Sequence, residues 1–211
     1  SSESIASVTL GTLEKIGEYA FFETAITQLP AFTADTEIGK YAFSFTDILS
    51  VTIPDGMEIA EGVFSECQSL QSVTIGNQVK IGKYAFSQDK DNIFVVNNYI
   101  ENEETYFYYT FQTALTELTI GNDVEIGENA FSNAHSLETV TLGENAEIGN
   151  MAFYNNSSLK NIDLSKAKSI GEYAFSGDSY MICLDDSMQV GAVSAEGNYM
   201  YTYHAPKLET V

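Results

Sequence analysis

Short alternations of apolar and polar residues recur along the chain at nearly constant spacing. Each reads apolar, polar, apolar and usually ends in Gly or Pro, as in Val73-Thr74-Ile75-Gly76. The alternations begin at Val8, Val51, Val73, Leu118, Val140 and Ile162. A period of two predicts a strand with one buried face, and the Gly or Pro predicts where that strand ends.

A second phrase, Ile-Gly-x-x-Ala-Phe, follows the strand unit and is complete at residues 126–131. Its first residue falls at Ile16, Ile38, Ile59, Ile81, Ile126, Ile148 and Ile170, in steps of 22, 21, 22, 45, 22 and 22 residues. The spacing of Ile, Ala and Phe suits a helical or 3-10 turn with one buried stripe. A period this constant is typical of a repeat architecture, in which stacked parallel strands bury a continuous apolar column.

The double step of 45 residues marks an irregular region at residues 87–114, for which two interpretations remain open. In the first, residues 93–96 are the strand of a degenerate rung, with Tyr106, Thr110 and Phe111 at the positions of the phrase. In the second, the region is a hairpin inserted at the rim.

Two further places break the pattern. Pro30 stands where repeat two should have its strand, and because proline removes a ladder donor we expect a bulge or weak pairing there. At the C-terminal end, residues 186–211 are irregular, although residues 181–184 fall where a ninth strand is expected.

Leu-x-x-Leu-x-Leu followed by a turn is the leucine-rich repeat pattern. Residues 63–70, with Cys67 after the phrase, resemble the BspA-like leucine-rich repeats of bacterial surface proteins, a subtype also described from Treponema. We therefore predict one α/β domain over residues 1–211, a right-handed leucine-rich-repeat solenoid of about nine rungs. Its rungs of 22–23 residues would place a parallel sheet on one face and short helical or 3-10 turns opposite.

The strongly negative net charge disfavours some classes of binding partner. The 211 residues include 30 acids, 9 lysines and no arginine, which gives a formal net charge of −21. Nucleic acid and anionic lipid are disfavoured as partners, because both are bound by basic patches. No run of 18 apolar residues exists, so no direct membrane insertion is expected. The polar start at residues 1–4 lacks an initiator Met and a signal peptide, which indicates a processed piece.

The exposed positions of the strands are the first candidate binding surface, because side chains alternate along a strand and the middle Thr points outward. The candidates here are Thr52, Thr74, Thr119, Thr141 and Glu117. In leucine-rich repeats this sheet is the usual ligand face. A structural role stays open, since Thr favours strands and neighbouring hydroxyls can pair.

Two tyrosine clusters are the second candidate: Tyr106, Tyr108 and Tyr109 in the irregular region, and Tyr201 and Tyr203 near the C-terminus. Exposed Tyr supplies contact area at low entropic cost. The alternative is that these rings fill caps and core where the repeats become irregular.

Charged residues on the turn side alternate in sign between rungs. Glu18, Lys40, Glu61 and Lys83 share one slot, and Lys15, Glu37, Glu58 and Lys80 share another. We expect ion pairs between rungs, worth about 0–1 kcal/mol each, that set register rather than function. Beyond the irregular region, Glu125, Glu128 and Glu147 are expected to lose their lysine neighbours.

The sequence gives little support for a disulfide, a catalytic site or a metal site. Cys67 and Cys183 would lie about five rungs, or roughly 24 Å, apart, too far for a disulfide, so both are predicted to be unpaired and partly buried. A Cys183–His204 pair belongs to no catalytic motif. Asp123 and Glu125 fit no calcium loop. No catalytic residue, cofactor or metal site is therefore predicted.

The resemblance implies an extracellular or cell-surface bacterial protein that is not an enzyme. Its implied role is adhesion to proteins or glycans of a host or of neighbouring cells through the repeat surface. The alternative is a structural stalk that presents another module on the cell surface. We expect a monomer.

Overall fold

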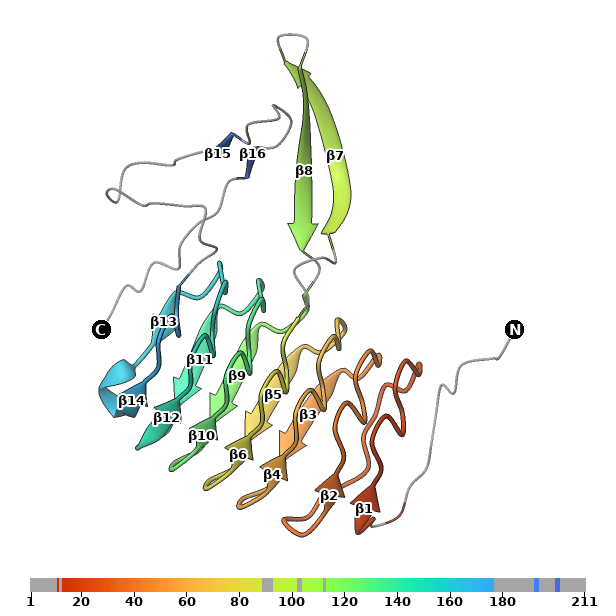
Figure 1. Ribbon diagram of the computed structural model, residues 1–211, viewed down its shortest axis with the longest axis vertical. Coiled ribbons are helices and arrows are strands. Elements are labelled where there is room, and N and C mark those ends of the chain that lie inside the picture. Colours follow the sequence, from red (N-terminus) through yellow and green to blue (C-terminus); the bar gives the residue numbers. More distant parts are fainter. Residues whose placement is uncertain are drawn as a thin grey trace.

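The rungs lie side by side in chain order, from the N-terminal rungs at one end to the C-terminal rungs at the other (Figure 1). This computed structural model describes residues 11, 13–88, 93–101, 104–111, 113–176, 192–193 and 200–201. For β7, β8, β15 and β16 the description is of the backbone and its pairing. The described rungs form a parallel-sheet solenoid of about six turns, and the predicted nine rungs are not confirmed.

The first sheet consists of the strands that the alternating pattern predicts. In spatial order they are β13 (Asn161–Ile162), β11 (Thr139–Leu142), β9 (Glu117–Ile120), β5 (Ser72–Ile75) and β3 (Ser50–Ile53), and all are parallel. The alternation beginning at Ile162 makes a shorter strand than predicted, because Asp163 instead caps the 3-10 helix η1 (Leu164–Lys166). Around Pro30 no strand is described, in agreement with the missing ladder donor.

A second parallel sheet lies across the solenoid from the first and was not predicted. It consists of β14 (Ala167–Ile170), β12 (Ala146–Ile148), β10 (Glu125–Ile126), β6 (Lys80–Ile81) and β4 (Glu58–Ile59), and a separate parallel pair, β1 (Lys15–Ile16) and β2 (Glu37–Ile38), precedes it in the chain. In β4, β6 and β10 the first residue is exposed and the Ile of the phrase is buried. The Ile of the phrase is thus a strand residue rather than part of a helical stripe.

The predicted helical turns are not confirmed, because the phrase instead forms a β-turn with one left-handed residue. In the second rung the Ala42 amide donates to the Gly39 carbonyl at 3.3 Å, and Tyr41 between them has a φ of +54°. A left-handed residue cannot continue a right-handed helix. The same slot has positive φ in the other rungs, at Tyr19, Gly62, Tyr84, Asn129, Met151 and Tyr173. With η1 as the single helix among the described residues, the fold is a β-solenoid rather than an α/β fold.

Of the two interpretations of the irregular region, the structure shows the inserted hairpin and not the degenerate rung. β7 (Ile93–Glu101) and β8 (Glu104–Phe111) pair antiparallel, and Figure 1 shows them projecting away from the two sheets. β5 pairs directly with β9, and β6 pairs directly with β10. The two rungs on either side of the insertion are in close contact, since a Cβ added at Gly127 would lie 2.5 Å from the Ile81 carbonyl oxygen.

The C-terminal end is described only at β15 (Ala192–Val193) and β16 (Met200–Tyr201), which pair antiparallel. The predicted ninth strand at residues 181–184, and the predicted first strand beginning at Val8, lie outside the described residues.

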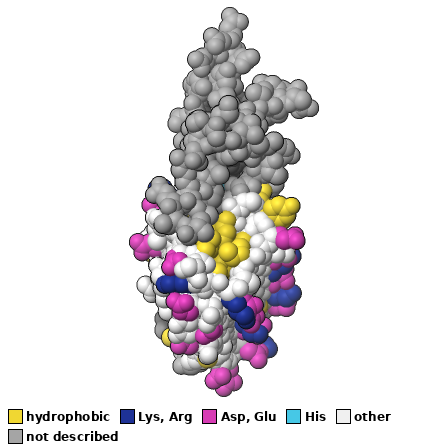
Figure 2. Space-filling view, turned by 90° about the vertical axis from the view of Figure 1, so that its left-hand side faces the viewer, with side chains coloured by type: hydrophobic (Ala, Val, Ile, Leu, Met, Phe, Trp, Pro, Cys, Tyr) yellow, Lys and Arg dark blue, Asp and Glu magenta, His cyan; other side chains and the backbone are white. Residues whose placement is uncertain are grey.

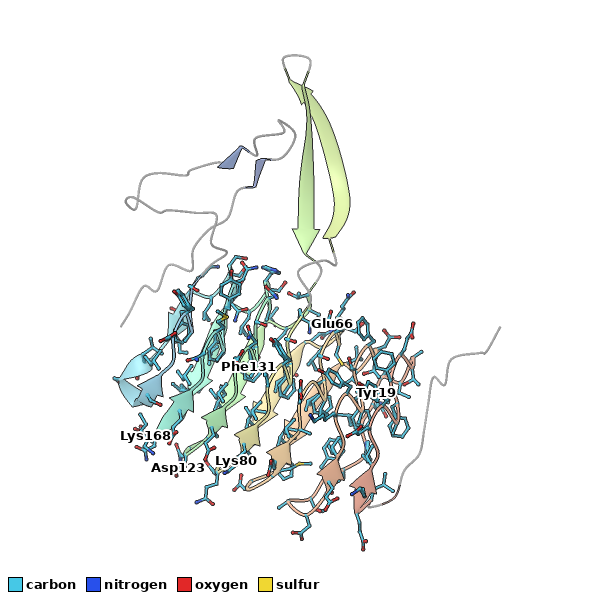
Figure 3. All side chains as sticks on the ribbon, in the orientation of Figure 1. Tyr19, Glu66, Lys80, Asp123, Phe131 and Lys168 are labelled. Atoms are coloured by element: carbon cyan, nitrogen blue, oxygen red, sulfur yellow. The ribbon has the colours of Figure 1, made fainter. Side chains whose placement is uncertain are left out.

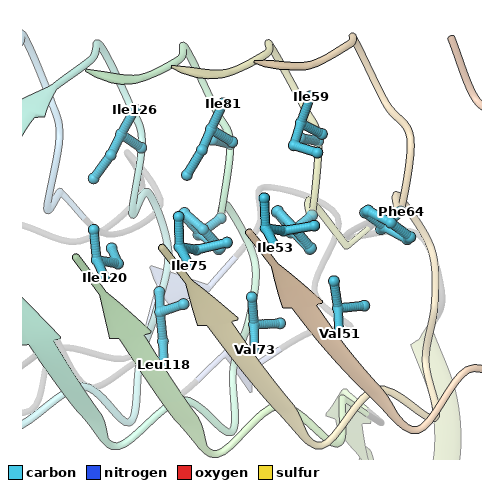
Figure 4. Close-up of a cluster of buried hydrophobic side chains, with 14 of the residues drawn as sticks. Val51, Ile53, Ile59, Phe64, Val73, Ile75, Ile81, Leu118, Ile120 and Ile126 are labelled. Carbon is cyan, nitrogen blue, oxygen red and sulfur yellow. The ribbon is translucent and has the colours of Figure 1, made fainter. Parts of the chain in front are cut away.

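The core is a column of rings between the two sheets. The phenylalanines that close the phrase are fully buried in five successive rungs: Phe43, Phe64, Phe86, Phe131 and Phe153. Neighbouring rings stack with centroids 5.1 to 5.6 Å apart. Figure 4 shows Phe64 with the inward Val and Ile side chains of both sheets. Each rung therefore buries its apolar face only against its neighbours, as a repeat architecture requires.

Candidate interaction surface

The exposed face of the first sheet carries a column of threonines in register. Thr52 pairs with Thr74, Thr74 with Thr119, and Thr119 with Thr141, and all four side chains are exposed. Successive members of such a column lie about 4.8 Å apart. The hairpin does not interrupt the column, so the predicted surface is continuous from β3 to β11.

A second column runs beside the threonines on the same face. Its members are Ser50, Ser72, Glu117, Thr139 and Asn161, which are paired strand to strand. Glu117 is the charged member of this column, and its neighbours carry hydroxyl or amide groups. Asp163, which the pattern places in the threonine column, leaves it: its carboxylate accepts hydrogen bonds from the Ser165 amide and hydroxyl, which lower the pKa of Asp163. The face offers many neutral hydrogen-bonding groups for recognition.

Ion pairs between rungs are confirmed on the turn side and the second sheet. Lys15 pairs with Glu37 at 2.6 Å, and Lys40 pairs with Glu61 at 2.9 Å. Their mutual hydrogen bonds raise the pKa of each lysine and lower that of each glutamate. Lysines and acids lie next to one another along the edge of the described part (Figure 2).

The predicted loss of lysine neighbours beyond the irregular region is wrong. Because the hairpin is not a rung, Lys80 meets Glu125 at 3.5 Å and Lys83 meets Glu128 at 2.8 Å. Lys168 of β14 supplies the partner of Glu147. The charge columns thus continue across the insertion, in keeping with a role in register.

The predicted tyrosines are not brought together with the threonine face by any described contact. In the hairpin, Tyr106 is opposite Tyr99, and a register irregularity falls between Val95 and Asn97, which are opposite Tyr109 and Tyr108. Tyr201 pairs with Ala192 in the β15–β16 ladder. Tyr203 lies outside the described residues.

An aromatic cluster on the first two rungs was missed by the sequence analysis. Tyr19, Phe22 and Phe45 are 54%, 37% and 46% exposed. Tyr19 stacks on Tyr41 with centroids 5.5 Å apart, and Phe22 contacts both Tyr19 (5.6 Å) and Phe45 (5.5 Å). Figure 3 labels Tyr19 at the N-terminal end of the rungs. An alignment of the rungs gives a signal for it, since Phe22 stands where five of the six later rungs have Ser and the other has Tyr154.

Cys67 fits a structural role rather than a catalytic one. Its thiol is buried and lies 3.1 Å from the Phe43 carbonyl and 3.3 Å from the Thr46 hydroxyl. Burial raises the pKa of Cys67 to about 11, so the reactive thiolate is scarce near neutral pH. Within the described residues, no group of three or more His, Cys, Asp or Glu is placed to hold a metal ion. No helix there has the length and apolar character that a membrane crossing needs.

A family model described as the BspA type leucine rich repeat region matches residues 1–93 and 100–189, in six copies. The break between the two matched parts falls within β7. No curated protein is similar enough to the chain to match it.

Three solved bacterial structures are similar to the chain. A leucine-rich repeat protein from Bacteroides ovatus is 24% identical with a TM-score of 0.53, over 80% of this chain and 45% of that one. The pneumococcal vaccine antigen PcpA is 18% identical with a TM-score of 0.27, over 76% and 57%. A leucine rich cell surface protein from Faecalibacterium prausnitzii is 18% identical with a TM-score of 0.22, over 71% and 64%. The chain thus spans about half the length of these proteins or a little more.

Proposed function

We propose that this chain, which belongs to the BspA-type leucine-rich repeat family, is a non-enzymatic module for binding proteins or glycans. The observation that carries the proposal is the unbroken exposed face of the first sheet, where Thr52, Thr74, Thr119 and Thr141 form one column. A rigid face of this kind offers many hydrogen-bonding groups at fixed spacing. Binding of that kind needs no catalytic residue, metal or cofactor.

The proposed role in the cell is adhesion to proteins or glycans of a host or of neighbouring cells. Its proposed location is the cell surface or the extracellular space, as the resemblance to the BspA-like repeats of bacterial surface proteins implies. The net charge of −21 disfavours nucleic acid and anionic lipid as partners. We also propose that the chain is a monomer with one domain over residues 1–211. Glu117 and the predicted tyrosines are proposed to contact the partner.

The test is saturable binding to immobilised host extracellular proteins and mucin glycans in moderate salt. The variant Thr119→Lys places a bulky charge in the middle of the threonine column. The matched control is Ser169→Lys, an exposed position of β14 on the second sheet. Binding weakened by Thr119→Lys but not by Ser169→Lys supports the proposal.

A structural stalk remains the second candidate, because the rings stacked from rung to rung, together with ion pairs between several of the rungs, also make a rigid spacer. A stalk would bind nothing on the panel. Partner binding that is unchanged by Thr119→Lys would likewise contradict a ligand role for the threonine face.

A further inference from the structure

The exposed rings of the first two rungs form one connected surface, which we call the N-terminal aromatic patch: Tyr19, Phe22, Tyr41 and Phe45. The rings are joined by three contacts, one stacked and two edge-on, with centroids 5.5 to 5.6 Å apart. Tyr19, Phe22 and Phe45 keep 37% to 54% of their surface exposed. Aromatic side chains with this much open surface are the usual anchors of protein interfaces.

The fold does not require aromatic residues at two of these positions. The slot of Phe22 holds a buried serine in the next four rungs, at Ser44, Ser65, Ser87 and Ser132, and then Tyr154 and Ser176. The slot of Phe45 holds Glu23 one rung before it and Glu66 one rung after it, and later rungs use Gln88 and Asn133. Small or polar residues therefore satisfy the same backbone.

Three of the four patch residues have a left-handed backbone conformation. Tyr19, Tyr41 and Phe45 have φ of +55°, +54° and +58°, a region that bulky residues seldom adopt. The slot of Tyr19 and Tyr41 has positive φ in the other rungs as well, where it holds Gly62, Tyr84, Asn129, Met151 and Tyr173. Because this conformation recurs along the solenoid, the exposure of the rings rather than their backbone geometry points to a role beyond packing.

Carboxylates flank the rings. Backbone hydrogen bonds place Glu23, Phe45 and Glu66 in one column of successive rungs, so Phe45 lies between two acids. Glu18 directly precedes Tyr19 in the sequence, and Lys40 of the next rung pairs with Glu61 and is also attracted by Glu18. The patch therefore combines apolar rings with negative charge, within a chain of net charge −21.

A cation on a ring of this slot already occurs within the molecule. The Lys83 ammonium lies 5.1 Å from the centroid of Tyr84, which occupies the slot of Tyr19 and Tyr41 two rungs further on. Attraction between cations and ring faces acts within about 6 Å. A lysine or arginine from outside could make the same contact with the open surfaces of Tyr19 and Phe45.

We infer that the N-terminal aromatic patch docks a lysine- or arginine-bearing segment of a partner protein, whose cations lie on the rings and pair with Glu23. A glycan fits less well, since sugar rings stack on flat platforms and these rings cross at 74° and 66°. The inference rests on the proposed function, because it names a surface and a partner chemistry for that binding module.

The experiment measures fluorescence anisotropy of a labelled Gly-Ser peptide that carries several lysines, against the same peptide with acetylated lysines. The patch variant combines Phe22→Ser and Phe45→Asn, residues that equivalent slots already contain. Tyr173→Asn is the control, because it removes an exposed ring in the slot of Tyr19 and Tyr41 near the other end of the solenoid. Circular dichroism and urea unfolding verify that each variant is folded.

The patch variant is expected to bind the lysine peptide roughly five- to thirtyfold more weakly, while Tyr173→Asn leaves the affinity unchanged. Acetylation of the peptide should have an effect of similar size. An unchanged affinity in the folded patch variant would overturn the inference, as would loss of mucin glycan binding with the lysine peptide unaffected.

The two proposals fail in different ways. If the patch variant keeps both its peptide affinity and its binding to the immobilised protein panel, the inference is wrong and the proposed function stands. If the wild type binds no protein or glycan on the panel yet binds the lysine peptide through the patch, the adhesion role is wrong and the surface assignment stands.

Discussion

Removing one ring from the middle of the phenylalanine column should destabilise the whole solenoid. Phe131 is fully buried, and its ring stacks on Phe86 and Phe153 with centroids 5.1 and 5.4 Å away. Replacing a buried Phe by Ala costs about 3–5 kcal/mol through lost burial and the cavity left behind. Since Phe131→Ala also breaks stacking on both sides, worth about 0.5–1.5 kcal/mol per ring pair within that total, we expect about 4 kcal/mol.

Urea unfolding followed by circular dichroism measures this loss as a change in the free energy of unfolding. Leu49→Ala is the control, because Leu49 is 45% exposed and should cost less than about 1 kcal/mol. The slope of the transition should stay constant, so that the midpoint shift reports stability alone. A loss below about 1 kcal/mol for Phe131→Ala would refute the idea that stacked rings hold the rungs together.

Two further predictions concern the insertion and the buried thiol. The interval of 45 residues exceeds a 22-residue step by 23, so deleting the 23 residues 89–111 should restore a normal rung and leave the free energy of urea unfolding within about 1 kcal/mol; a loss of several kcal/mol would mean that the hairpin is part of the stack. In a Cys183→Ser background, native Cys67 should resist Ellman's reagent at pH 8 and react once unfolded. Because burial raises the pKa of Cys67 from 9.0 to about 11, its contribution to stability is complete below pH 9 and is lost as pH rises towards 11. Fast reaction of Ellman's reagent with the folded protein would show that Cys67 is not buried.

The repeat and its first sheet could be read from the sequence because burial imposes a period. Val73 and Ile75 must face inward while Thr74 faces outward, and every rung repeats that demand. The ion pairs on the turn side follow from the same period, since Lys40 and Glu61 share a slot one rung apart. In the first sheet and on the turn side, the residue pattern within a rung and the stacking of rungs favour the same structure. The sequence was therefore sufficient to predict both.

The hairpin could not be distinguished from a rung by spacing alone. Its inserted length of 23 residues nearly equals one step of the repeat, so the phrases after it keep the spacing that an extra rung would give. Strand direction separates the two cases, because a rung needs parallel pairing whereas β7 and β8 pair antiparallel. The expected loss of lysine neighbours at Glu125 and Glu128 followed from the rung interpretation alone, and their lysine partners lie directly across the insertion.

The second sheet and the aromatic patch were missed for different reasons. Two-residue strands such as β6 (Lys80–Ile81) are too short to show a period, and the Ile-x-x-x-Ala-Phe spacing also fits a helix. The patch depends on rings at left-handed positions, and φ is not visible in a sequence. Two signals were visible: Phe22 in a slot that most later rungs fill with Ser, and Phe45 in a slot that other rungs fill with Glu, Gln or Asn.

The continuity of the sheet across the insertion is the claim on which the binding face depends. It is tested most directly by a disulfide between Thr74→Cys and Thr119→Cys in a Cys183→Ser background, with Thr52→Cys and Thr119→Cys as the control pair. Thr74 and Thr119 are direct strand partners, so their Cα atoms should be about 5 Å apart and cross-link under mild oxidation. The control pair, two strands apart at about 10 Å, should not. Efficient cross-linking of the first pair alone would confirm the continuous face, and its absence would show that a rung lies between β5 and β9.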